Sequence, residues 1–267
     1  FASVISDGKA GRAAARCGLG ALMGAKRLKA VVARGTKPIR FYDEEKFNEG
    51  VKKILNLFPI KKPEEAHEAH MALFRNFFTL GRVPVKNFLE GSFDNGLKYV
   101  EDMRKARQFH CKHCPYDCTE SYMTSNGERH MVWEAWGPLG TNCLIDDPKA
   151  LQNAYALCNR YGMDAISIGA VMSFAMECFE KGLITKKDTD GIELCWGNGQ
   201  AMVEMVRKIG EREGLGELMG EGVKRAAERI GGRASEYAMH VKGLELPAHE
   251  PRAANGTALG YATGSIG

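Results

Sequence analysis

The stretch from Asp164 to Leu183 is apolar on nearly every side between Ile166 and Phe179. A helix without a polar face has to be buried, either in a membrane or in the middle of a domain. The run is shorter than the roughly 18 to 20 apolar residues that a membrane-spanning helix needs, and no other run of the chain reaches that length. We therefore expect this segment to be the central helix of a domain.

Amphipathic helices are predicted around this central segment. Asp147 and Pro148 are typical of a helix start, and Gly162 is typical of its end. Two further helices are predicted over residues 197–216 and 216–232, followed by a strand-like stretch over residues 235–247. The predicted fold class is therefore mostly α-helical in this piece of chain.

The N-terminal part has a different character. Its Gly- and Arg-rich start is followed by "LKAVVARG", which is typical of a β-strand ended by a glycine. A helix is then predicted with Asp43 as its N-cap and Pro59 as its stop, and another around residues 64–79. The chain opens on Phe1 and closes without a final helix, so we expect an interior piece of a longer protein that begins with the end of a β-rich domain.

Composition excludes several classes of protein. The 267 residues are 44% hydrophobic, which is enough to bury a substantial core, and the net charge is +4. Basic residues do not gather into a stripe with aromatic side chains, so nucleic acid is not an expected partner. Eight cysteines in a Met-rich chain of this size favour reduced thiols over a disulfide framework, and a soluble, cytoplasmic protein is expected.

Three of the cysteines lie close together in "FHCKHCPYDCTE": Cys111, Cys114 and Cys118. Their short spacing lets three thiolates converge on one small volume, as three ligands of an iron–sulfur cluster do. Structural zinc with His110 or His113 as a fourth ligand is a second interpretation, and ordinary unligated thiols are a third.

The other histidines and cysteines carry weaker signals. His67 and His70 lie one helical turn apart, but without a third ligand nearby a solvated helix face explains them. Cys158 and Cys178 fall on apolar helix faces, where a buried thiol behaves as a small hydrophobic side chain. A fourth cluster ligand would be one of the isolated cysteines Cys143, Cys158, Cys178 and Cys195, or would lie beyond residue 267.

Four collinear stretches resemble the aldehyde ferredoxin oxidoreductase family of tungsten enzymes. They are "GRAAARCGLGALMGAKRLKAVVARG", the stretch from "GPLGTNC" to "FEKGL", "GEREGLGELMGEGVKRAAERIGG" and "HVKGLELPAHEPRAANGTALGYAT". The resemblance covers the chain apart from about residues 40–105. It implies that residues 1–40 end an N-terminal β-rich pterin-base domain, that residues 41–243 form a first helical domain, and that residues 244–267 begin a second.

The resemblance also implies the cofactors. Family members hold tungsten, or molybdenum in some relatives, between two pterins, with a 4Fe–4S cluster alongside and a Mg²⁺ ion between the pterin phosphates. Cys111, Cys114 and Cys118 match three of the four cluster cysteines, and the fourth is expected beyond Gly267 together with a proton-relaying histidine.

Five further residues are implied to be site residues. Asp164 matches a pterin-bonding aspartate; its place before an apolar run also permits a helix N-cap, and one residue can do both. In "ARCGLG", Arg16 would balance phosphate charge, while Gly18 and Gly20 would allow close backbone approach. Glu134 matches a glutamate near the metal, where a carboxylate can move a proton.

The sequence departs from the family near the substrate. Trp133 and Trp136 flank Glu134 where smaller neighbours are expected, and His249 and Glu250 stand where the family commonly has Tyr and Asp. Indoles at this place could narrow a pocket or line it for an aromatic substrate. These differences concern the substrate more than the cofactor.

The function implied by the resemblance is interconversion of an aldehyde and a carboxylic acid. Electrons would pass through the 4Fe–4S cluster to ferredoxin or to a partner subunit, in a homo-oligomer or a larger complex. Two alternatives remain open: a tungsten subunit resembling class II benzoyl-CoA reductase, which reduces an aromatic ring, and a helical scaffold with a structural zinc site and no redox role.

Overall fold

The computed structural model describes residues 1–6, 12–57, 72–91, 107–109, 119–124, 127–131 and 133–265. Helices dominate these residues, as predicted. Residues 72–79 are helical, and the other helices are α1 (Leu19–Ala25), α2 (Glu44–Leu57), α5 (Trp133–Leu139), α6 (Pro148–Tyr161), α7 (Ala165–Glu180), α8 (Gly199–Glu211), α9 (Leu215–Met219), α10 (Val223–Ile230) and α11 (Asn255–Thr263). Short 3₁₀ turns are η2 (Thr141–Cys143), η3 (Ala234–Glu236) and η4 (Pro251–Ala253).

The strands are short and pair in antiparallel sheets. β1 (Val4–Ser6) pairs with β2 (Arg12–Ala14), with Ile5 opposite Ala13. β4 (Thr119–Thr124) lies between β3 (Arg107–Phe109) and β5 (Gly127–Met131), and Phe109 faces Thr119 across the first pair. β6 (His240–Val241) and β7 (Leu244–Glu245) form a small hairpin within the predicted strand-like stretch.

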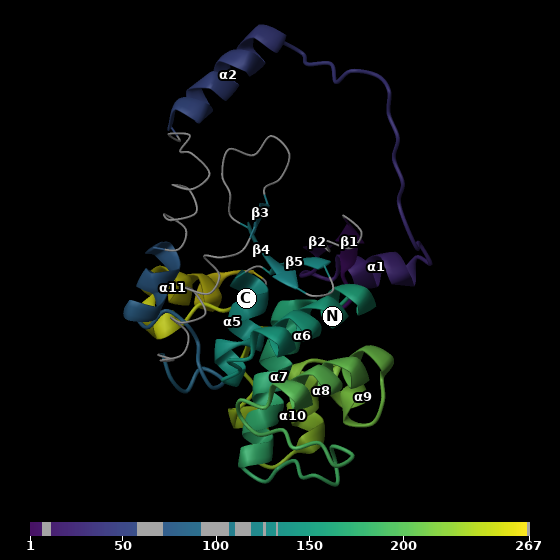
Figure 1. Cartoon of the computed structure of the whole chain (residues 1–267), viewed down its shortest axis with the longest axis vertical. Helices are drawn as coiled ribbons and strands as arrows, with labels where there is room; N and C mark the ends of the chain where they lie inside the picture. Colours follow the sequence, from purple (N-terminus) through teal and green to yellow (C-terminus); the bar gives the residue numbers. More distant parts are fainter. Residues whose placement is uncertain are drawn as a thin grey trace.

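Helix α7 is the centre of the helical body, as the sequence predicts. All of its residues from Ser167 to Cys178 are buried. Helices α5, α6, α8 and α10 contact it, and Figure 1 shows them grouped around it. Cys158 and Cys178 are fully buried in this core, which confirms their expected role as small apolar side chains.

The predicted helix caps of the central body are confirmed. Asp147 accepts a hydrogen bond from the Lys149 backbone N–H at 2.9 Å and caps α6, and Gly162 ends that helix at a φ of 67°.

The single helix predicted over residues 216–232 is wrong, because the chain forms α9 and α10 with Gly222 between them at a φ of 93°. A positive φ is outside the helical region, so the glycine breaks the helix.

The segment between α1 and α2 differs from its prediction. The strand expected at "LKAVVARG" is absent: residues 28–36 have no regular structure, and Val31 and Val32 are 76% and 90% exposed. A strand needs a neighbour for its backbone hydrogen bonds, and no described strand pairs with this segment. Asp43 caps α2 as predicted, accepting from the Lys46 N–H at 3.0 Å.

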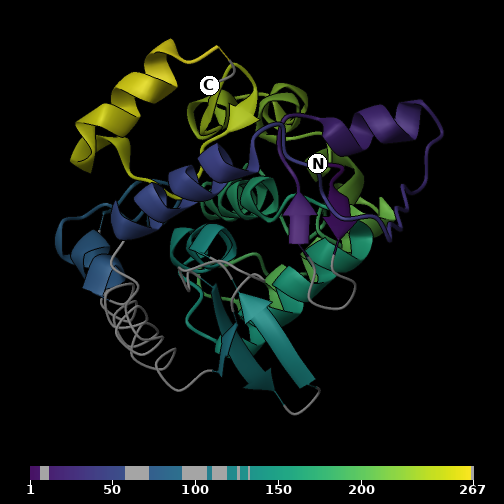
Figure 2. The ribbon, with the colours of Figure 1, turned by 90° about the horizontal axis from the view of Figure 1, so that it is seen from above.

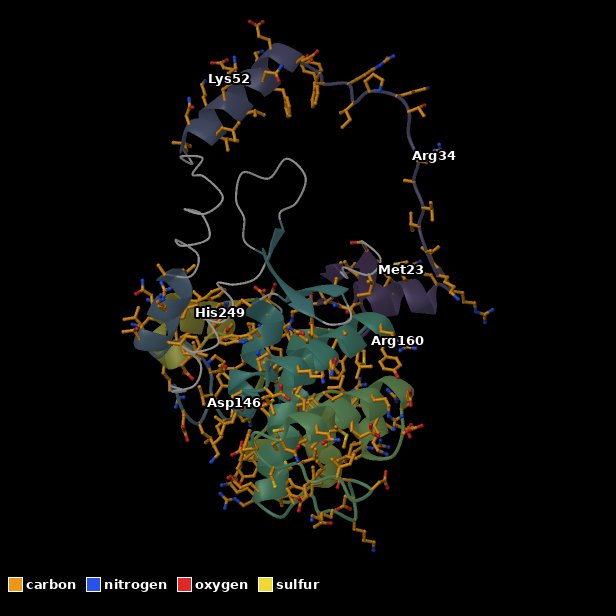
Figure 3. All side chains as sticks on the ribbon, in the orientation of Figure 1. Met23, Arg34, Lys52, Asp146, Arg160 and His249 are labelled. Atoms are coloured by element: carbon orange, nitrogen blue, oxygen red, sulfur yellow. The ribbon has the colours of Figure 1, made fainter. Side chains whose placement is uncertain are left out.

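Helix α2 stands off the helical body. It has no buried residue, although its apolar side chains lie on one face. Figures 1 and 2 show the long extended connection that leads to it, and Figure 3 shows Arg34 and Lys52 on this arm, away from the crowded side chains of the body.

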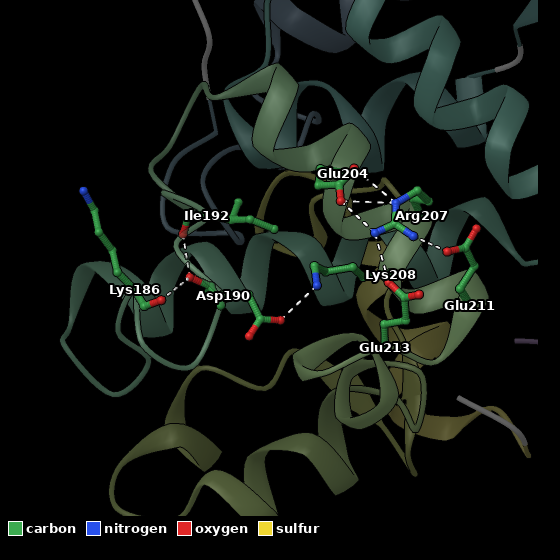
Figure 4. Close-up of polar contacts among 9 residues, drawn as sticks. Lys186, Asp190, Ile192, Glu204, Arg207, Lys208, Glu211 and Glu213 are labelled. Atoms are coloured by element: carbon green, nitrogen blue, oxygen red, sulfur yellow. Dashed lines mark hydrogen bonds and ion pairs between the residues drawn. The ribbon is translucent and has the colours of Figure 1, made fainter.

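Ion pairs cover the outer face of α8. Arg207 donates to Glu204 at 2.8 Å and to Glu213 at 3.0 Å, and it also bonds Glu211. Lys208 reaches Asp190 at 2.9 Å, as Figure 4 shows. Exposed pairs of this kind contribute only ~0.2–1 kcal/mol each. These ion pairs therefore add little to the free energy of folding, which comes mainly from the buried core.

A buried polar network ties the loop after residues 72–79 to α7. Asn87 donates from Nδ2 to the Glu177 carboxylate at 2.6 Å and to the Tyr237 carbonyl at 2.8 Å. Ser173 donates to Asn87 Oδ1 at 3.1 Å, and Asn142 donates to the Ser173 hydroxyl at 2.9 Å. Every side chain of this network therefore has a partner in a region closed to water.

We expect Glu177→Gln to gain thermal stability relative to the wild-type protein as pH rises. Burial raises the pKa of the Glu177 carboxyl, and the Asn87 bond offsets this only in part. A carboxyl whose pKa rises on folding stabilises the fold below its unfolded-state pKa and loses that contribution as pH rises through the folded-state value. Gln can accept the same Asn87 bond without burying a charge.

The measurement is the thermal midpoint of both proteins between about pH 4 and about pH 8. The midpoint difference should grow in favour of Glu177→Gln toward high pH. Glu228→Gln, which changes an exposed glutamate of α10, gives the baseline. A difference that stays constant with pH would contradict the prediction.

None of the helices in the described part of the chain combines the length and the apolar character that crossing a membrane requires.

Candidate functional site

A cavity of about 320 Å³ lies between the end of β2, helix α5, helix α6 and the start of α7. Arg16, Glu134 and Asp164 line it, so the fold brings together three site residues that are far apart in the sequence. Tyr155 and Asn159 of α6 complete the polar part of the lining. Sequence reasoning missed these two, although their spacing of four residues on a predicted helix places them on one face.

Asp164 is the N-cap of α7. Its carboxylate accepts from the Ile166 N–H at 3.2 Å, from the Ser167 N–H at 3.3 Å and from the Ser167 hydroxyl at 2.8 Å. The residue is only 3% exposed. The N-cap interpretation is confirmed. A carboxylate has about four acceptor positions, so one remains for a ligand in the cavity, and a bond to a pterin stays a prediction.

Arg16 lies two residues after β2, and its side chain bonds a residue near the other end of the sequence. Its Nη2 donates to the Glu245 carbonyl at 2.6 Å, and its Nε is 3.8 Å from Asp164 Oδ2. Its Nη1 is buried and has no hydrogen-bond partner among the residues that the structure describes. A buried donor without a partner costs ~1–3 kcal/mol, so this side chain suits a ligand rich in acceptor oxygens.

Glu134 is in the first turn of α5, which begins two residues after β5. Its side chain is exposed at the cavity. His249 lies near it: burial lowers the pKa of His249, and the negative charge of Glu134 opposes that shift. His249 does not line the cavity; its ring lies 6.4 Å from that of Trp133, the residue before Glu134.

The two tryptophans pack in an aromatic cluster instead of lining the cavity. Trp136 is 2% exposed, and the Trp133 ring stacks on Phe74 with centroids 5.0 Å apart. Phe77 and His249 also contact Trp133, at 5.5 and 6.4 Å. The expectation that the indoles narrow or line a pocket is therefore wrong for this cavity, because the helical residues 72–79 supply aromatic partners for both.

Glu250 has a structural role in this part of the fold. It is 2% exposed, and its carboxylate pairs with Arg252 at 2.7 Å. It also accepts from the Arg252 backbone N–H at 2.9 Å, which caps η4.

The glycines of "ARCGLG" do not line the cavity. Gly18 has a φ of 78° and is the N-cap residue directly before α1. A Cβ on Gly20 would lie 2.3 Å from the Ala2 carbonyl oxygen, so the close approach that this glycine allows is to the chain's own backbone. Their predicted approach to a cofactor stays a prediction.

Cys111, Cys114 and Cys118 lie outside the described residues, as do His67, His70, His110 and His113. The strand residues that flank the cysteine run, Phe109 and Thr119, are paired across β3 and β4. No group of three or more His, Cys, Asp or Glu side chains within the described ranges could hold a metal ion.

Three of the four isolated cysteines, Cys143, Cys158 and Cys178, are buried in the apolar core and are poor candidates for the fourth ligand. Cys143 and Cys158 are fully buried, and burial raises the pKa of both thiols, whereas a ligand cysteine must be a thiolate. Burial also raises the pKa of Cys178, to about 12. Cys195 is exposed, like Cys17 in the "ARCGLG" segment.

The family model described as aldehyde ferredoxin oxidoreductase, domains 2 and 3, matches residues 70–267. This chain belongs to the aldehyde ferredoxin oxidoreductase family. The tungsten-containing aldehyde ferredoxin oxidoreductase of Pyrococcus abyssi is 37% identical over 281 residues, across the whole of this chain and 45% of that protein. The aliphatic sulfonate oxidoreductase, WOR-like subunit, of Pyrococcus furiosus is 31% identical, across 93% of this chain and 42% of that protein.

A solved structure shares the fold. The active-site complex BamBC of benzoyl coenzyme A reductase, in complex with 1,5-dienoyl-CoA, aligns with a TM-score of 0.74 and 25% identity. The alignment covers 93% of this chain and 40% of that chain.

The present chain spans less than half the length of the aldehyde ferredoxin oxidoreductase relatives that it matches, and all of these relatives are oxidoreductases by name.

Proposed function

We propose that this chain binds a tungsten or molybdenum bis-pterin cofactor in an enzyme that interconverts an aldehyde and a carboxylic acid. The cavity that joins Arg16, Glu134 and Asp164 carries the proposal. When bound, the metal–pterin group supplies two-electron redox chemistry. The aldehyde gains an oxygen atom from water and releases two electrons and two protons, and ferredoxin or a partner subunit accepts the electrons.

The residues present suit parts of such a cofactor. Arg16 offers a buried, unpartnered N–H that fits phosphate oxygens, and Asp164 offers one acceptor position for the N–H-rich edge of a pterin. Glu134, exposed at the cavity, would hold or transfer one of the two protons that the reaction releases. Gly18 and Gly20 would shape the "ARCGLG" segment against the cofactor, with Mg²⁺ between the pterin phosphates.

Cys111, Cys114 and Cys118 would supply three ligands of a 4Fe–4S cluster. The described geometry that supports this is the pairing of Phe109 with Thr119, which brings both ends of the cysteine run together. Residues 1–40 would end the β-rich base domain, residues 41–243 would form the first helical domain, and residues 244–267 would begin the second.

Ring reduction by a tungsten subunit like that of benzoyl-CoA reductase is the second candidate function. The structural similarity to BamBC supports it. The tryptophans no longer do, because they pack in the aromatic cluster rather than at the cavity. Turnover of aldehydes compared with turnover of an aromatic acyl-CoA by the full-length protein separates the two candidates.

We expect the full-length protein, purified without oxygen, to contain one tungsten or molybdenum atom and about four iron atoms per chain. Elemental analysis for tungsten, molybdenum, iron and zinc measures this directly. Asp164→Ala should lower the tungsten or molybdenum content, while Glu228→Gln on the exposed face of α10 should not. Zinc alone in the wild-type protein would overturn the proposal and would support the scaffold with a structural zinc site.

A further inference from the structure

We infer that Glu245 is a positioning residue that holds Arg16 and Asp164 in place across the cavity and tunes the cofactor through Asp164. This inference rests on the proposed function of the cavity. Glu245 is not among the cavity's lining residues, and neither the family resemblance nor the sequence pattern singled it out. It is the last residue of β7 and is 3% exposed.

The backbone of Glu245 fixes one wall of the cavity. Its carbonyl accepts the Arg16 Nη2 hydrogen bond at 2.6 Å, which ties the segment after β2 to the β6–β7 hairpin. The guanidinium is planar and its donors have fixed directions, so this bond determines where Nε and Nη1 point. Nε then lies near Asp164, and Nη1 is left without a partner in the described part of the chain.

The side chain of Glu245 fixes the other wall. Its Oε2 accepts from the Ser167 hydroxyl at 2.9 Å, and its Oε1 accepts from the Val223 N–H at the start of α10 at 3.0 Å. The same Ser167 oxygen is 2.8 Å from Asp164 Oδ2. Ser167 therefore stands between two buried carboxylates, one at the first turn of α7 and one at the first turn of α10.

A hydroxyl has a single proton, so Ser167 can donate to only one of these carboxylates at a time. The carboxylates of Glu245 and Asp164 therefore compete for the hydrogen bond that the Ser167 hydroxyl donates. No ion pair to Glu245 occurs among the described residues; its charge is stabilised by the Ser167 hydroxyl, the Val223 N–H and the positive end of α10. Hydrogen bonds made to the residues that contact a metal cofactor orient those residues and tune the reduction potential of the cofactor.

The substitution Glu245→Gln changes the hydrogen bond to Ser167 without changing how the side chain packs. The variant keeps the carbonyl bond to Arg16 and the size of the side chain. Its amide oxygen can accept from Val223, and its NH₂ group then donates to Ser167, which commits the Ser167 hydroxyl to Asp164. The variant also removes one buried negative charge, so the cofactor accepts electrons more readily.

The test is a redox titration of the metal centre in the full-length enzyme, followed by electron paramagnetic resonance. We expect Glu245→Gln to keep the wild-type metal content and to shift the midpoint potential of the tungsten or molybdenum centre to more positive values. Glu177→Gln is the matched control, because it makes the same substitution at a buried glutamate of α7 roughly 20 Å along the helix from Asp164. Its potential should equal that of the wild-type enzyme.

Two results would overturn the inference. One is a Glu245→Gln enzyme with full metal content and an unchanged potential, which would make Glu245 an anchor of the hairpin only. The other applies where Glu245→Gln does not fold: Ser167→Ala then breaks the link to Asp164 while keeping both carboxylates, and an unchanged potential in that variant would refute the link. A wild-type enzyme without tungsten or molybdenum would instead refute the proposed function itself.

Discussion

Replacing Glu134 by Gln should lower turnover of an aldehyde by about 10²- to 10⁴-fold while leaving the metal content unchanged. Glu134 is exposed at the cavity and lines it from the first turn of α5. Gln has nearly the same size but cannot take up a proton, so the variant loses proton transfer and keeps the packing. The measurement is kcat with a redox dye as electron acceptor, together with elemental analysis of the same sample.

Glu228→Gln is the control for Glu134, since it removes an exposed carboxylate from the remote helix α10. Its turnover should match that of the wild-type enzyme. Unchanged turnover in Glu134→Gln would show that proton transfer does not depend on this carboxylate and would leave Glu134 with a structural role. A loss of metal in that variant would point to cofactor binding instead.

Local signals predicted the central helices well. The apolar run of α7, and Asp147 and Gly162 at the ends of α6, determine structure through neighbours a few residues away. The strand expected at residues 28–35 failed for the opposite reason. Its β-branched residues indicate a strand only where another strand lies beside them, and the sequence of the segment does not contain that information.

The site was predictable only in part. The resemblance to known enzymes singled out Arg16, Glu134 and Asp164, and the fold brings them to one cavity. It could not show how they are held, because Arg16 and Glu245 bond across 229 residues of sequence. The packing of the tryptophans could likewise not be predicted from the sequence. Their partners Phe74 and Phe77 lie on a distant helical segment that no spacing rule connects to α5.

Gly169→Ala should destabilise the protein by about 3 kcal/mol or more. The added Cβ would lie 2.4 Å from Pro138 Cβ, 2.5 Å from the Pro138 carbonyl carbon and 2.7 Å from its oxygen. Two of these atoms are backbone atoms in the last turn of α5, where every residue is buried, so no flexible side chain can move aside. Alanine favours a helix over glycine by up to ~1 kcal/mol, which is too little to offset the clash.

Gly24→Ala is the matched control, because Gly24 is also in a helix and an added Cβ there meets nothing within 4 Å. Its thermal midpoint should stay the same or rise slightly, whereas that of Gly169→Ala should fall by several degrees. Equal midpoints for the two variants would show that α5 and α7 can separate without cost.

The contact at Gly169 also bears on catalysis. Gly169 lies five residues after Asp164, and Pro138 lies four residues after Glu134, so the contact is about one helical turn from each side of the cavity. Pushing α5 away from α7 should therefore move Glu134 relative to Asp164. We expect the folded fraction of Gly169→Ala to lose turnover at a temperature where Gly24→Ala is fully active. Full activity per folded molecule would show that the spacing of the two helices does not position Glu134.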